Sequence, residues 1–76
     1  MQEHDHIKED ASIEELNVLI KFMVSHNKSH NEELASIATK LEKAGKTKEA
    51  EKIKAIVKEL STSNDKLAQV EKDLEG

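Results

Sequence analysis

The sequence predicts an all-α protein, an antiparallel two-helix hairpin that pairs with a second copy into a four-helix bundle. Charged residues make up 37% of the 76 and hydrophobic residues 36%, with two glycines and no proline. This composition is typical of long helices. Two stretches space their apolar residues three and four apart, as helices that pack on a partner do. Gly45 provides the turn signal between these stretches.

The N-terminal segment, residues 1–11, shows no apolar periodicity, and we expect it to be a flexible tail. His4 and His6 flank Asp5, an arrangement that can bind a metal ion weakly, but we expect these side chains to be part of a solvated tail. The segment lacks the apolar run of a secretory signal, so we expect no such signal here.

The first helix is predicted over 12–44. Ser12 and Glu15 form a capping-box pattern, in which each side chain accepts a hydrogen bond from the other residue's backbone amide. A seam in steps of three and four then follows, at Ile13, Leu16, Ile20, Met23, Asn27, His30, Leu34, Ile37, Leu41 and Ala44. Two of its positions are polar, and they suggest a site in the middle of the helix.

The turn is predicted at 45–47 and the second helix at 48–75, with Thr47 as its N-terminal cap. Its seam is Ala50, Ile53, Val57, Leu60, Asn64, Leu67, Glu71 and Leu74. The polar run at 61–65 favours a turn by residue type. Because the seam passes through this run unshifted, we expect one continuous helix.

Folding back at Gly45 brings the polar seam positions of both helices to the same level. Asn27 pairs with Asn64 in this register, and His30 lies beside Leu60 and Ser61. These residues form a predicted polar layer. One interpretation is structural: a polar residue in a seam fixes register and oligomeric state at some loss of stability. His30 would then be neutral and bonded to Ser61 or Asn64.

The second interpretation is a transition-metal site at His26, His30 and Glu33, which share one helical face. Two histidines four residues apart offer two imidazoles to one ion. Glu33 is either a third ligand or a partner that holds one imidazole in place. A symmetric dimer would double the ligands, and nitrogen ligands suit zinc, nickel or copper better than calcium or magnesium. A pH-sensing or small-molecule role is a further alternative.

Dimer contacts are predicted at Val18, Phe22 and Ile56, which are apolar but lie off the hairpin seam. A core of this size leaves only about 3–5 kcal/mol of net stability. We therefore expect two hairpins to pair and bury these flanks.

The sequence lacks the residues that several classes of function require. The chain has no cysteine, no glycine-rich phosphate loop and no nucleophile elbow, so we expect no enzyme. The net charge of −4 and the scattered lysines argue against nucleic acid. No stretch approaches the roughly 20 apolar residues of a membrane span, and we expect a cytoplasmic protein.

The segment L-x-x-L-I-K-F-M-V-S-H-N-K-S-H-N-E-E-L, with the later S-N-D-K-L, resembles a group of small, uncharacterised prokaryotic helical domains that carry H-N-x-x-H on a long first helix. The resemblance implies that His26, Asn27 and His30 are a family feature, and it implies no activity. The sequence thus predicts a non-enzymatic assembly or interaction module, a homodimer with room for a protein partner, whose polar layer can bind a transition metal. The alternative is a dedicated carrier or sensor of zinc, nickel or copper that uses the two histidines.

Overall fold

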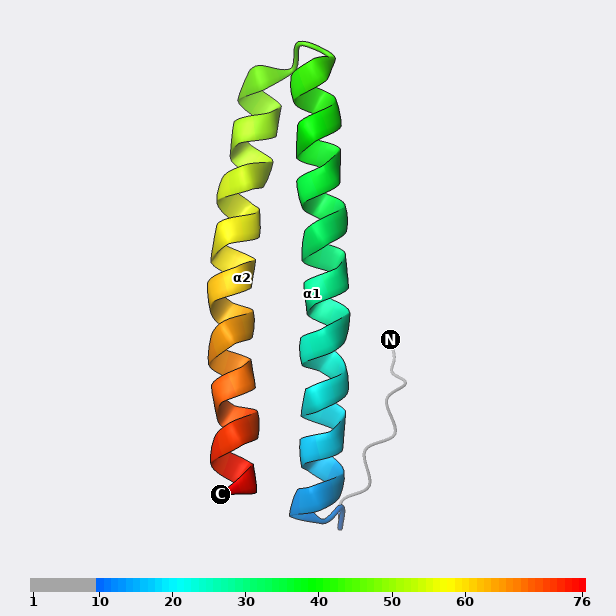
Figure 1. The fold of residues 1–76 in the computed structure, drawn as a ribbon, viewed down its shortest axis with the longest axis vertical. Coiled ribbons are helices and arrows are strands. Elements are labelled where there is room, and N and C mark those ends of the chain that lie inside the picture. The colour runs from blue at the N-terminus through cyan, green and yellow to red at the C-terminus, as the bar shows by residue number, and fades with distance from the viewer. Residues whose placement is uncertain (1–9) are drawn as a thin grey trace.

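Two antiparallel helices lie side by side over most of the chain (Figure 1). The computed structural model describes residues 10–76, so the predicted tail at 1–11 falls almost wholly outside the described residues. Helix α1 spans Ile13–Lys43 with 31 residues, and α2 spans Thr47–Glu75 with 29 residues. Each is about 45 Å long at 1.5 Å per residue. The predicted all-α hairpin is confirmed.

The start of α1 has the predicted capping box. The Ser12 hydroxyl accepts a hydrogen bond from the Glu15 amide at 3.1 Å, and the Ser12 amide donates to Glu15 Oε1 at 2.8 Å. Two amides that lack partners in the first turn are satisfied in this way. Ser12 is therefore the cap, and the helix begins one residue later than predicted.

The turn is built around Gly45, whose φ of +86° is open to glycine at little cost. The Gly45 amide donates to the Glu42 carbonyl at 3.0 Å and the Lys46 amide donates to the Leu41 carbonyl at 2.8 Å. These two bonds form a Schellman motif, which ends α1 sharply.

The prediction that Thr47 caps α2 is wrong. Thr47 is the first helical residue, and the cap position belongs to Lys46, which makes no side-chain capping bond. The Schellman motif closes the connection within Ala44–Lys46, so α2 begins one residue earlier than predicted.

Helix α2 runs without interruption through the polar run at 61–65, as predicted. The Thr62 hydroxyl donates to the Lys58 carbonyl one turn earlier, at 3.0 Å. This bond satisfies the hydroxyl within the helix, so it does not compete with the helical backbone bonds.

The contact between the helices is narrow. Among the described residues only Ala38 and Ala50 are fully buried, and no larger side chain is. Half-buried apolar residues complete the seam: Leu16, Ile20, Val24, Leu34 and Leu41 on α1, and Ile53, Val57, Leu67 and Ala68 on α2.

The predicted α1 seam is correct at Leu16, Ile20, Leu34 and Leu41. It is wrong at three positions that lie between Ile20 and Leu41. Met23, His30 and Ile37 are exposed, and the next residues, Val24, Asn31 and Ala38, face α2 instead. The α1 sequence has two adjacent stripes in steps of three and four, and the small Ala38 suits the closer approach to α2.

The apolar residues that do not face the partner helix form an exposed surface along one side of the hairpin, which we call the apolar face. Its members come from both helices: Leu19, Met23 and Ile37 of α1, and Ile56, Leu60, Val70 and Leu74 of α2. His30 and Leu60 line one hollow between the helices, whereas Lys28, Glu32, Ser61 and Asp65 line a hollow on the other side. The hairpin therefore has one apolar side and one polar side. Between Asp10 and Gly76, neither helix is apolar over a length that could cross a membrane.

Candidate functional site

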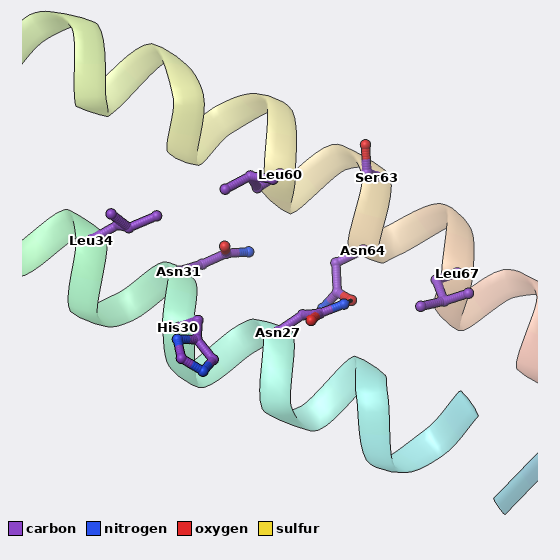
Figure 2. A pocket seen from close by; sticks show the side chains of 8 residues that line it. All are labelled: Asn27, His30, Asn31, Leu34, Leu60, Ser63, Asn64 and Leu67. Carbon is purple, nitrogen blue, oxygen red and sulfur yellow. Dashed lines mark hydrogen bonds between the residues drawn. The ribbon is translucent and has the colours of Figure 1, made fainter. Parts of the chain in front are cut away.

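The polar layer lies midway along the hairpin, where Asn27 of α1 meets Asn64 of α2 (Figure 2). Asn27 Nδ2 donates to Asn64 Oδ1 at 3.1 Å, and Asn64 Nδ2 donates to the Val24 carbonyl at 2.9 Å. Asn64 is half-buried, and its amide is satisfied on both sides. The layer thus holds the two helices in one register, because a shift of either helix would break both bonds.

An open hollow of about 370 Å³ borders the layer on the apolar side. Figure 2 shows Leu34 and Leu60 on facing helices, with Asn31 between Leu34 and the Asn27–Asn64 pair. The lining consists of Asn27, His30, Asn31, Leu34, Leu60, Ser63, Asn64 and Leu67.

Ser61 does not join His30 in the layer. It lines the hollow on the polar side with Lys28 and Asp65, whereas His30 and Ser63 line the hollow on the apolar side. Of the two residues predicted beside His30, Leu60 lines the same hollow as His30 and Ser61 does not, because the seam position next to the layer belongs to Asn31. The spacing does contain this signal, since Asn31 follows Asn27 by four residues.

His26 and His30 form a pair on the exposed side of α1. Their Nε2 atoms lie 2.9 Å apart, and their rings meet edge to face with centroids separated by 4.4 Å. Glu33 Oε1 lies 3.5 Å from His30 Nδ1, the other nitrogen of that ring. The expected bond from His30 to Ser61 or Asn64 is absent among the described side chains, whose polar contacts to His30 come from His26 and Glu33.

One pair of tautomers fits this geometry. A carboxylate beside His30 Nδ1 favours a proton on that nitrogen, which leaves the Nε2 lone pair free. His26 Nε2–H then donates to it across the 2.9 Å separation. Glu33 is therefore the candidate orienting partner of His30, and the two Nε2 atoms are the candidate ligands.

One chain supplies too few ligands for a closed metal site. Within residues 10–76 no group of three or more histidine, aspartate or glutamate side chains is placed to hold a metal ion. The two imidazoles fill half of a tetrahedral shell. They are also accessible, because the His30 side chain is 59% exposed.

The three predicted dimer contacts remain exposed, and the hairpin seam uses none of them. Ile56 belongs to the apolar face. Phe22, 78% exposed, lies at the outer edge of the same side, and Val18, 63% exposed, lies farther round α1, away from α2.

Ion pairs link α1 to α2 near both ends of the hairpin. Near the turn, Lys54 Nζ lies 3.2 Å from Glu42 Oε1, and this hydrogen bond with its charge raises the pKa of Lys54. At the open end, Lys21 Nζ lies 3.4 Å from Glu75 Oε2. The ion pairs therefore lie toward the two ends of the hairpin, whereas the polar layer and the histidine pair lie in its middle.

The fold and the site define a small helical-hairpin domain with an amide layer between its helices and a histidine pair on its apolar side. Residues 16–74 match the family model described as a domain of unknown function, DUF8180. The chain belongs to this family. No curated protein and no solved structure matches it.

Proposed function

We propose that this chain is a non-enzymatic assembly module whose hairpin self-associates through the apolar face into a four-helix bundle. The observation that carries the proposal is the exposure of this face, seven large apolar side chains on one side of the hairpin: Leu19, Met23, Ile37, Ile56, Leu60, Val70 and Leu74.

The small core of the hairpin supports this proposal. Only two alanines are fully buried among the described residues, and both have small side chains. A domain of this size needs a larger core or an additional constraint, and the chain has no cysteine for a disulfide. Pairing the apolar faces would supply the missing burial at about 25 cal/mol for each Å² of apolar surface covered.

The experiment is sedimentation velocity over a concentration series, with chelator present. We expect a species of twice the 8.5 kDa chain mass that dissociates on dilution. Circular dichroism on the same samples reports the helix content. A monomer of full helix content at the highest concentration contradicts the proposal.

Two neighbouring positions in α2 provide a matched pair of variants. Leu60→Lys places a charge on the apolar face, and Ser61→Lys places the same charge on the polar side. We expect Leu60→Lys to abolish the dimer and Ser61→Lys to keep it. Leu60→Gln, which adds no charge, should weaken the dimer without abolishing the helix signal. Equal dimerisation of Leu60→Lys and Ser61→Lys would refute the role of this face.

A second candidate function is a dedicated transition-metal carrier or sensor. The convergence of His26 and His30 Nε2 at 2.9 Å favours it. A carrier should bind one ion per chain, and its metal affinity should be independent of the assembly state. Thermal melts with zinc or nickel, compared with a His26→Ala/His30→Ala variant, test it: an unchanged midpoint with every first-row ion rejects the carrier. A cytoplasmic location and the absence of a nucleic-acid partner stay predictions.

A further inference from the structure

The histidine pair occupies the centre of the exposed stripe of α1. This stripe runs through Leu19, Met23, His26, His30, Glu33 and Ile37. Its steps are four, three, four, three and four residues, so it reads the same in both directions. A stripe of this kind is complementary to itself when two copies of the helix pack antiparallel.

We propose that two hairpins pair antiparallel through this stripe, and that the pairing completes a four-histidine site for one zinc-like divalent ion. The inference rests on the proposed self-association and adds the register and the ligand. His26 and His30 of each copy are the ligands. One chain holds two of the four ligands, and the site is incomplete without the second copy.

The register follows from the spacing. An antiparallel pairing centred at the level of Lys28 sets His26 opposite His30 of the second copy, and Leu19 opposite Ile37. The polar layer keeps Ser63 level with Lys28, so the same axis sets Ile56 of α2 opposite Val70 of the other α2. Leu19 with Ile37, and Ile56 with Val70, are therefore apolar pairs on either side of the histidines, whereas Met23 lies opposite Glu33 of the second copy.

The geometry of the pair suits a metal ion. Zinc binds imidazole nitrogens at about 2.0–2.1 Å, so two nitrogens on one tetrahedral ion lie about 3.3–3.4 Å apart. The 2.9 Å between His26 Nε2 and His30 Nε2 is close to this spacing, and the rings must turn so that both lone pairs face the ion. When both Nε2 atoms bind the ion, the His26 proton moves from Nε2 to Nδ1, so both imidazoles stay neutral.

Charge also balances at the site. Four neutral imidazoles leave the ion with two positive charges, and Glu33 of each copy contributes one negative charge. Its carboxylate faces His30 Nδ1 at 3.5 Å, the position of an outer-shell partner that orients a metal-bound imidazole. On the polar side, Glu32 has the same charge and no place near the histidines.

The experiment measures zinc binding and dimerisation together. Titration calorimetry should give one zinc ion per two chains, and zinc should tighten the dimer at least about tenfold over the chelator-treated protein. Cobalt in place of zinc should give the intense visible absorption of a tetrahedral centre. His30→Ala should lose both effects. Glu33→Gln should lower zinc affinity about 10–100-fold, and its matched control Glu32→Gln should leave it unchanged.

Disulfide cross-linking tests the register separately. The native chain has no cysteine, so only introduced cysteines can form the disulfide. Equal amounts of Leu19→Cys and Ile37→Cys, mixed and oxidised, should form mainly the mixed disulfide. Preferential formation of Leu19→Cys homodimers overturns the antiparallel register.

The outcomes separate this inference from the proposed function. A dimer in chelator that zinc neither binds nor tightens overturns the metal site and leaves the assembly module intact. One ion bound to each monomer overturns the shared site and favours the carrier. A monomer under all conditions overturns both proposals.

Discussion

Asn64 should contribute more to the stability of the hairpin than Asn27, because it takes part in two of the layer's hydrogen bonds and Asn27 in one. A hydrogen bond contributes roughly 0.5–1.5 kcal/mol net. Asn64→Ala should therefore lower the free energy of unfolding by about 1–3 kcal/mol, and Asn27→Ala by about 0.5–1.5 kcal/mol. Asn27 is also the more exposed of the two, so water can replace its lost bond.

The assay is urea unfolding followed by circular dichroism, at one fixed protein concentration so that self-association affects all variants alike. A double-mutant cycle with Asn27→Ala/Asn64→Ala isolates the bond between the side chains, for which we expect a coupling of about 1 kcal/mol. If Asn27→Ala destabilises the protein as much as Asn64→Ala, the assignment of two bonds to Asn64 is refuted.

The double variant Asn27→Leu/Asn64→Leu tests the structural role of the layer. Replacing both partners by apolar groups should leave stability unchanged or raise it, because neither amide is left unpaired. It should also remove the feature that selects one register, so cross-linking between the helices should lose its preference for a single pairing. A single retained register would show that the seam alone selects it.

Three further predictions concern the ends of the helices. Ser12→Ala should lower the free energy of unfolding by about 1 kcal/mol in urea titrations, since it removes the cap of α1. Gly45→Ala should cost about 1–2 kcal/mol in the same assay through its positive φ alone, because no atom lies within 4 Å of the added Cβ. The pKa of Lys54 is raised in the folded state by its bond to Glu42, so its contribution is complete below its ordinary value of 10.5 and is lost as pH rises above it. Melting temperatures measured across that range should fall less steeply in Glu42→Gln, and an equal fall would contradict the pairing.

Local interactions made the ends of the helices and the turn predictable. Ser12 and Glu15 bond to backbone atoms three residues away, and Gly45 acts through its own φ. Both effects depend on a few neighbouring residues. The Thr47 cap was predicted wrongly for a related reason: threonine suits a cap, but the Schellman motif moved the helix start to Thr47 itself.

The register of the hairpin was also predictable, since one short turn constrains it. Pairing outward from Gly45 placed Asn27 opposite Asn64, and their side chains do bond. The same reasoning failed for His30 and Ser61 because height along a helix and rotation about its axis are separate quantities. The turn limits the height to a narrow range, within which the polar layer selects one register, and it leaves the rotation about the helix axis open.

The sequence by itself determined two long helices, their caps, the turn and the level at which the polar residues meet, because these follow from residue type and from separation along the chain. Only the tertiary structure decided which stripe of α1 faces α2, since Met23, His30 and Ile37 compete with Val24, Asn31 and Ala38 under the same periodicity. The packing against α2 selects the second stripe, and this choice is what leaves the histidine pair and the apolar face exposed.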